Sequence, residues 1–405
     1  MNHRIVICGL ALLAGTVLGA GGAMALEVDE ISPPRVVVEG EFFSTLDVVR
    51  QTDADGEPLL SDTRLNTGDS NIELILDKPL YPSGLVGGVA LNLALEHEAV
   101  QPRLSAFLGT SAYRLSFGQM RLRNTGVRFA TLRDGDLRTY THIPNASLET
   151  DEEAAQLYGD VVALDLYYRP AFLRLSLFGA ERVQTTDGGD GTFVEDEDAR
   201  ANSGGAALAF EVPDGMRYEY ALRKLMALHD VQTVEQLDGE RGSLAATLLA
   251  GVVGLNDNPE YPWELALQVL QNQGLDESPA STEAQLNREA YTAAVLGLSF
   301  GNRKFLQTRW SAGLTLAQKT FADLDDASQW SAVPAWFHRI GNGLDLVAQA
   351  NYTSYSDGLA SITGRQTDLT VQIGITMALD AAFNDNVVDP GSILETEQGR
   401  IFRGF

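Results

Sequence analysis

Residues 369–379 read LTVQIGITMAL, and their pattern sets the expectation for the whole chain. Leucine, valine, isoleucine or methionine occupies every second position, and threonine, glutamine, glycine or alanine fills the positions between them. Such alternation predicts a β-strand with one apolar and one polar face. Eleven tilted residues also match a strand that crosses a bilayer in a barrel, whereas strands of soluble sandwiches more often have about five or six.

The same kind of segment recurs along the chain. We predict sixteen strands, which cover residues 35–49, 69–77, 85–98, 103–109, 112–121, 160–169, 171–183, 203–212, 216–226, 243–254, 262–272, 289–300, 304–317, 331–340, 343–355 and 368–379. The segment 243–254 lacks clean alternation and is equally compatible with a short buried helix. The expected fold class is all-β: a transmembrane antiparallel β-barrel of about 16 strands.

The predicted connections alternate in length. Short connections carry turn residues such as Gly, Pro and Asn, whereas long ones are polar and mostly acidic; the long ones are 50–68, 122–158, 184–202, 227–242, 273–288, 318–330 and 356–367. Outer-membrane barrels show this asymmetry, with short periplasmic turns and longer external loops. A soluble β-sheet with one solvated face is the competing interpretation, but it has no reason to place every long loop at one end.

Several predicted strands carry their charges on one face. Glu39 and Glu41 alternate with apolar residues in 36–49, and Arg174 alternates with leucines in 171–183. Arg217 and Arg223 alternate in the same way with Met, Tyr and Leu in 216–226. An Arg or Lys that faces lipid costs about 2–4 kcal/mol at the bilayer midplane, so we expect these charged faces to line the lumen.

The segment from Leu122 to Tyr158 has mixed charge and no convincing strand or helix period. A long irregular segment inside a compact domain needs a functional place, and a wide barrel lumen provides one. We therefore expect 122–158 to fold into the pore and narrow it. The candidate pore-lining residues are Arg114, Arg174, Arg217, Arg223 and Arg309 on a basic wall, Asp134, Asp136 and Glu149 on the inward loop, and Glu39 and Glu41 on a strand.

The N-terminus has the pattern of a secretory signal. His3 and Arg4 precede an apolar run that ends at Ala23-Met24-Ala25, a small-x-small cleavage pattern, so we expect residues 1–25 to be removed. The single cysteine, Cys8, leaves with them, so we expect neither a disulfide framework nor a lipid anchor. Residues 26–379 would form the barrel, and 380–405 a C-terminal tail or a short closing strand.

The composition excludes some classes of function. The chain has 29 basic and 55 acidic side chains and a formal net charge of −26, which argues against binding to nucleic acid. With 44% hydrophobic residues it is too apolar for a disordered acidic chain. After the signal, its longest nearly unbroken apolar run, 243–255, is too short for a transmembrane helix. For an exported chain with strands of bilayer length, we expect the outer membrane of a Gram-negative bacterium.

The sequence resembles the general Gram-negative porin family over residues 36–121. VVVEGEFFSTLDVV is similar to the family's first strand, NIELILDKPLYPSGLVGGVALNLALEHE to its second strand, turn and third strand, and RLSAFLGTSAYRLSFGQM to its fourth and fifth strands. The resemblance implies a sixteen-stranded homotrimer whose third external loop, here 122–158, folds inward. The chain departs from the family where Gly118 is followed by Gln119 rather than by a basic residue, and its third loop has no Pro-Glu-Phe-Gly-Gly-like stretch.

The expected function is therefore passive diffusion of ions and small hydrophilic solutes through a water-filled channel, with the bilayer and lipopolysaccharide of the outer membrane as surroundings. The net acidity favours cations. A solute-specific channel and an outer-membrane hydrolase are the alternatives. The hydrolase requires an activated nucleophile, but His97, His142, His229 and His338 lie in no nucleophile motif. We expect no enzyme activity, no cofactor and no metal site, apart from a faint calcium-loop likeness at 53–56 and divalent cations on the acidic loops.

Overall fold

The computed structural model describes residues 27–28, 34–53, 55–66, 70–81, 85–96, 99–121, 128–129, 141–142, 158–187, 193–212, 214–235, 240–275, 278–282, 286, 288–302, 310–340 and 344–383. The expected signal peptide therefore lies outside the described residues, and so does the tail beyond residue 383. In this part of the chain, no helix has the length and apolarity needed to cross a membrane.

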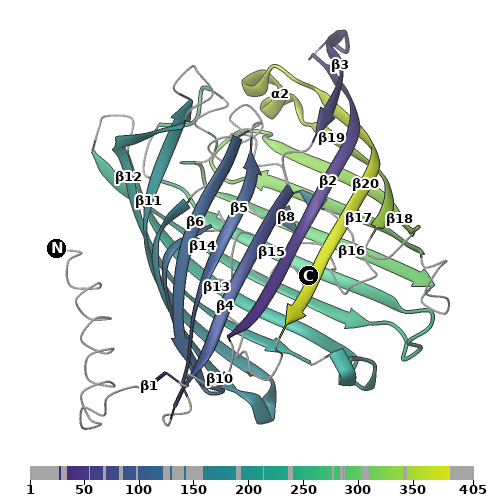
Figure 1. The fold of residues 1–405 in the computed structure, drawn as a ribbon. Helices are drawn as coiled ribbons and strands as arrows, with labels where there is room; N and C mark the ends of the chain where they lie inside the picture. The colour runs from purple at the N-terminus through teal and green to yellow at the C-terminus, as the bar shows by residue number, and fades with distance from the viewer. Residues whose placement is uncertain are drawn as a thin grey trace.

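Antiparallel strands make up nearly all of the described fold, as predicted (Figure 1). The strands of the wall are β2 (Arg35–Thr52), β4 (Ser70–Tyr81), β5 (Leu85–Glu96), β6 (Ala99–Gly109), β7 (Tyr113–Arg121), β10 (Tyr158–Tyr168), β11 (Leu173–Asp187), β12 (Phe193–Glu211), β13 (Leu222–Glu235), β14 (Arg241–Gly254), β15 (Trp263–Gln273), β16 (Tyr291–Asn302), β17 (Trp310–Phe321), β18 (Ser328–Arg339), β19 (Leu344–Tyr355) and β20 (Thr367–Phe383).

The pairings between these strands run in a ring. Each strand pairs with the next along the chain, including β7 with β10, and the last strand pairs with the first through β2 and β20. The sheet has 18 strands, and two of them, β1 (Glu27–Val28) and β3 (Pro58–Asn66), extend it outside the ring. The described ring therefore has the sixteen strands that the sequence predicts. Figure 1 shows β2 and β20, the two ends of the colour scale, side by side.

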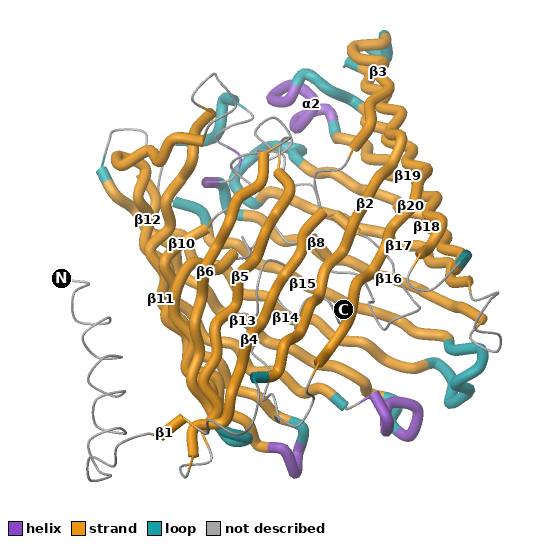
Figure 2. The backbone as a smooth tube through the Cα atoms, in the orientation of Figure 1, coloured by secondary structure: helices purple, strands orange, loops and turns teal. Residues whose placement is uncertain are grey.

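The two ends of the barrel differ. One end carries tight connections, among them the 3-10 helices η1 (Arg169–Ala171) and η2 (Asp214–Glu219). The other end carries β3, which forms a hairpin with the end of β2, and the helix α2 (Asp357–Thr363) between β19 and β20 (Figure 2). Most of the segment 122–158 lies outside the described residues. Within it, β8 (Arg128–Phe129) pairs with β9 (Thr141–His142). The inward position of that loop stays a prediction.

Two strand predictions differ from the structure in their bounds, and a third, less secure one is confirmed. The strand predicted at 216–226 begins only at Leu222, because residues 214–219 form η2, and it continues as β13 to Glu235. The strand predicted at 304–317 begins at Trp310 and continues to Phe321. The segment 243–254, which a helix could have explained equally well, lies in β14. Long loops are also partly ordered: β11 and β12 continue their pairing to Asp187 and Phe193.

β7 separates from β6 at Gly118. β6 and β7 pair up to Ser105 and Gly118, whereas β7 pairs with β10 as far as Arg121. Gly118 has φ +122, and an added Cβ there would lie 2.6 Å from the carbonyl oxygen of Leu104. Only glycine takes this conformation without strain. The glycine thus fixes the place where the wall releases the strand that leads into 122–158.

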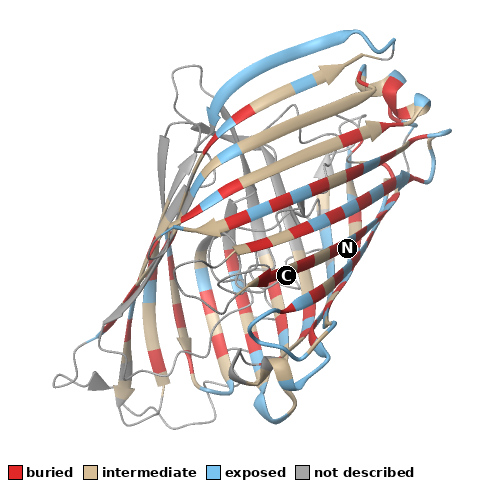
Figure 3. Cartoon of the chain, turned by 90° about the vertical axis from the view of Figure 1, so that its right-hand side faces the viewer, coloured by how far each residue is buried: buried red, intermediate tan, exposed pale blue. Residues whose placement is uncertain are grey.

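The two faces of the wall have opposite surroundings (Figure 3). Along β17, for example, residues 311, 313, 315, 317, 319 and 321 are buried, whereas 314, 316, 318 and 320 are exposed. Large apolar side chains such as Leu249, Leu314 and Ile373 are exposed. The buried face holds most of the charged side chains. A soluble protein buries its apolar side chains and exposes its charged ones, which is the reverse of this distribution. It arises because side chains alternate along each strand of a wall that closes into a ring.

Candidate functional site: the inward face of the barrel

Charged side chains gather on the inward face near the tight-turn end. They lie in the first few residues of the strands that start there and in the last few of the strands that end there: Arg35, Asp77, Arg114, Asp165, Arg174, Glu211, Arg223, Lys224, Glu264, Arg339 and Asp345. Together they form a belt of both signs, which we call the charged belt.

Most of the belt is held by ion pairs between strands. Arg35 of β2 binds Asp77 of β4, with its Nε 2.9 Å and its Nη2 2.5 Å from Asp77 Oδ2. Arg339 of β18 and Asp345 of β19 make a similar two-point contact, at 2.5 and 3.1 Å. Two-point arginine–carboxylate contacts fix geometry as well as charge. Asp165 accepts a hydrogen bond from Ser176 of β11.

A bulge in β13 places two consecutive cations on the inward face. The pairing of β13 with β14 shifts between Leu222 and Lys224, so Arg223 and Lys224 are both buried. Arg223 Nη1 lies 3.5 Å from Glu264 Oε1, and both side chains are almost completely buried. Lys224 Nζ lies 2.8 Å from Glu211 Oε1. A bulge of this kind re-aims side chains, and here it adds a positive charge to the belt.

A chain of hydrogen bonds crosses β19, β20 and β2 on the inward face. The amide of Gln349 donates to Gln372, and the Gln372 amide donates to the carboxylate of Asp47 at 2.9 Å. Thr45 donates to the same carboxylate at 2.6 Å. Asp47 is only 1% exposed. This part of the wall is therefore polar and acidic, and the register adds the positions of Glu39 and Glu41 on the same face of β2.

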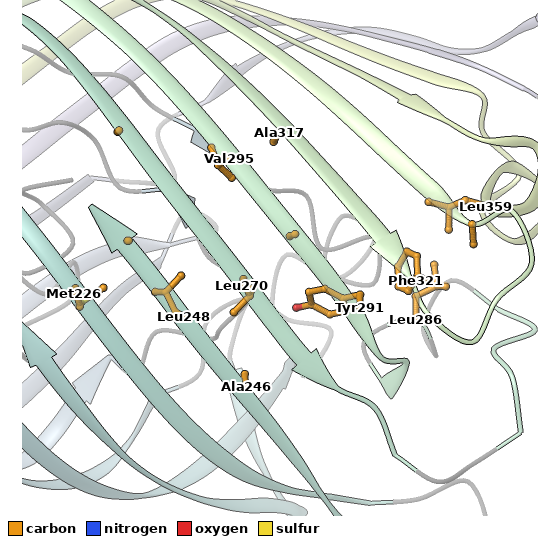
Figure 4. Packing of buried hydrophobic residues seen from close by; sticks show 14 of the residues in the cluster. Met226, Ala246, Leu248, Leu270, Leu286, Tyr291, Val295, Ala317, Phe321 and Leu359 are labelled. Atoms are coloured by element: carbon orange, nitrogen blue, oxygen red, sulfur yellow. The ribbon is translucent and has the colours of Figure 1, made fainter. Parts of the chain in front are cut away.

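The opposite part of the wall carries a large apolar cluster between polar residues such as Gln268, Ser299 and Lys319, and the sequence did not lead us to expect this cluster. Inward side chains of β12 to β17 form a buried hydrophobic cluster, in which Met226, Leu248, Leu270, Val295 and Phe321 are the largest aliphatic or phenyl members (Figure 4). Here β14 is apolar on both faces. That explains why 243–254 shows no alternation.

Connections at the long-loop end pack against this apolar wall. Leu286, from the connection between β15 and β16, and Leu359 of α2 are both fully buried in the same cluster as Phe321 (Figure 4). Ser356 accepts a hydrogen bond from the amide of Ser328, which fixes the start of α2 to β18 at 2.8 Å. α2 and the β15–β16 connection thus cover the inner side of β16 to β19 at this mouth.

The structure places only part of the predicted pore lining. Arg114, Arg174 and Arg223 lie on the inward face, and Arg174 Nη2 is 3.9 Å from Glu211 Oε2. Glu39 and Glu41 are described by their backbone register only, and so is Arg217, which lies in η2 rather than on a strand. Arg309, Asp134, Asp136 and Glu149 lie outside the described residues.

The calcium-loop likeness at 53–56 has a structural explanation. The Asp53 carboxylate accepts hydrogen bonds from the backbone amides of Asp55, at 3.0 Å, and Glu57, at 2.9 Å, and Gly56 has φ +80. Asp53 thus stabilises the turn between β2 and β3 through its own neighbours. Among the described residues, no group of three or more His, Cys, Asp or Glu side chains is arranged to hold a metal ion.

Several inward residues were not among the sequence candidates: Asp77, Asp165, Lys224, Glu264, Lys319 and Asp345. The signal that could have found them is their position at alternate sites near strand ends. Lys224 lies out of phase because of the bulge, and no local pattern indicates that. Lys319 has its Nζ 4.0 Å from the ring centre of Tyr291, a cation–π contact that needs the register of β16 and β17.

No protein family and no curated protein matches this chain by sequence. Solved structures match its fold. The chain has the fold of an outer-membrane β-barrel. The anion-selective porin from Comamonas acidovorans is 12% identical, with a TM-score of 0.57 over 85% of this chain and 99% of its own. In-vitro folded OmpT, an outer membrane protein of Vibrio cholerae, is 9% identical, with a TM-score of 0.54 over 87% and 100%. The outer membrane channel DcaP of Acinetobacter baumannii is 10% identical, with a TM-score of 0.52 over 88% and 100%.

Proposed function

We propose that the protein is an outer-membrane porin that lets ions and small hydrophilic solutes diffuse passively through its barrel. The observation that carries the proposal is the ring of sixteen strands with apolar side chains outside and a charged belt inside. A ring leaves no unpaired strand edge, as spanning a membrane requires. A barrel of about sixteen strands encloses an aqueous channel, and its lining sets selectivity.

Aromatic side chains on the outer face support the membrane assignment. Near the tight-turn end, the rings of Trp263 and Phe300 stack at 4.9 Å, and Trp310 meets Phe300 edge-on at 5.7 Å. Near the other end, Trp330 lies 5.3 Å from Tyr352. Amphipathic rings at both ends of the strands suit the two headgroup levels of a bilayer.

The histidines favour a channel over a hydrolase. His229 is exposed on the outward face of β13, where its Nδ1 lies 3.0 Å from Thr247 Oγ1. His338 stacks on the outward-facing Trp336. Neither of these two, which are the histidines whose side chains the structure describes, lies on the inward face, where a soluble substrate would meet a general base. We infer that the protein acts without enzymatic chemistry.

The remaining parts of the proposal concern place and assembly. We infer export by the N-terminal signal, residence in the outer membrane among lipid and lipopolysaccharide, and a homotrimer. A structure of the Vibrio cholerae protein OmpT is described as a trimer form, which supports a trimer here. We also infer a preference for cations, because the net charge is −26 and Asp47 and Glu73 are buried on the inward face.

Planar-bilayer recordings of the purified protein test the function. We expect stepwise conductance that rises in proportion to salt concentration, as in a general porin; current that saturates would instead indicate a solute-specific channel. Silent insertion, verified by flotation with liposomes, would refute the channel. In a salt gradient, a cation-selective reversal potential is expected, and an anion-selective one would overturn the selectivity.

A further inference from the structure

A regular patch of glycines and hydroxyls lies on the inward face of β16 and β17. Three cross-strand pairs form it: Gly297 with Thr315, Ser299 with Gly313, and Gly301 with Ser311. In each pair a hydroxyl faces a glycine, and the order reverses from one pair to the next. All six residues are buried. We call these six residues the Gly–hydroxyl patch.

Among the described residues, the three hydroxyls of the patch find no hydrogen-bond partner. Ser299, Ser311 and Thr315 are 1%, 2% and 0% exposed, and the Oγ atom of each is unpaired. Ser331 and Thr353, inward hydroxyls on β18 and β19, bond to each other at 2.9 Å. Burying a hydroxyl without a partner disfavours folding, so three neighbouring ones call for an explanation.

The surroundings of the patch combine one more uncommitted donor with an aromatic ring. On β15, Ala266 pairs with Gly297 and Glu264 pairs with Ser299. Gln268 lies one inward position beyond Ala266, is 3% exposed, and its Nε2 has no hydrogen-bond partner among the described residues. Phe337 of β18 is paired with Ser311 in the register and is 3% exposed. Both groups are uncharged. The nearest charge on β15, Glu264, is already engaged by Arg223 at 3.5 Å.

We infer that the Gly–hydroxyl patch is a binding subsite for a neutral polyhydroxylated solute of the sugar class. Hydroxyls both donate and accept, so three of them, roughly 7 Å apart on the diagonals, complement the hydroxyls of one sugar-sized molecule. The glycines place no side chain between them, and Phe337 offers an apolar surface to sugar C–H groups. The inference deepens the proposed porin function and rests on it.

Equilibrium binding of maltose to the purified protein in detergent, followed by saturation-transfer NMR, tests the subsite without requiring conductance. The test variant is the triple substitution Ser299→Ala, Ser311→Ala and Thr315→Val. Each lost hydrogen bond should raise the half-saturating maltose concentration roughly two- to tenfold. Thr320→Val, an exposed position on the outward face of β17, is the matched control and should leave it unchanged.

The unfolding temperature distinguishes a binding role of the three hydroxyls from a structural one. Because no hydrogen bond is lost in the sugar-free protein, the triple variant should unfold at the same or a higher temperature than the parent. Equal maltose binding by parent and triple variant, or no maltose binding by a parent that conducts normally, overturns the subsite. If the parent binds maltose, the triple variant does not, and the parent never conducts, the subsite stands and the porin function is refuted.

Discussion

At the scale of single residues, Gly118 is a position where adding even one methyl group should destabilise the barrel. Its φ of +122 and the 2.6 Å approach of a Cβ to Leu104 leave no room for a methyl group. We expect Gly118→Ala to destabilise the barrel by about 1–3 kcal/mol, measured as a lower thermal unfolding midpoint in detergent. Gly179→Ala is the control, since its Cβ would meet nothing within 4 Å. Equal midpoints for the two variants would contradict this account.

The inward-facing charged residues differ in whether the sequence alone could predict their positions. The inward position of Arg114 and Arg174 follows from alternation, which the sequence displays. The pair Arg223–Lys224 does not, because a bulge places consecutive residues on one face and no composition signal marks it. The contact of Lys319 with Tyr291 depends on which residues the register of β16 and β17 brings together.

At the scale of strands, the outward face of β17 provides a test of the membrane assignment. Leu314 is 43% exposed in the middle of the strand, and Thr320 lies near its end. In lipid, Leu314→Arg should cost about 2–4 kcal/mol of folding free energy and Thr320→Arg only about 0–1 kcal/mol. Denaturant titrations in vesicles measure both. A soluble sheet would tolerate the two changes alike, and that result would count against a lipid-facing surface.

Strand prediction worked where one face is apolar and the other polar. It placed the start of β13 at 216 rather than at Leu222, because η2 (Asp214–Glu219) carries alternating residues that belong to a turn. It also missed β3, whose leucines do not gather on one face, and the far ends of β11 and β12, which are mostly polar on both faces. Beyond the bilayer a strand no longer needs an apolar face, so the periodic signal disappears while the pairing continues. The apolar inner face of β14 was missed because its outer face is apolar too, so the sequence shows no alternation there.

At the scale of the whole molecule, one gel tests the closed ring and the proposed trimer independently of each other. A barrel in which each strand is paired on both sides resists unfolding by mild detergent. Unheated samples should therefore migrate differently from boiled ones, and a band about three times the monomer mass should persist below the temperature at which the monomer unfolds. Identical migration before and after heating would be incompatible with the ring. A heat-modifiable band of monomer mass alone would leave the ring intact and remove the trimer.

The pairing of Val36 with Phe383 joins nearly opposite ends of the described chain. Hairpins of neighbouring strands can form as soon as each is available, but this seam has to wait for the last strand, and such distant contacts make folding slow. A chain that ends before β20 therefore cannot close the ring. Because the seam brings both ends together, a circularly permuted gene that opens the chain at a tight turn should yield the same cylinder.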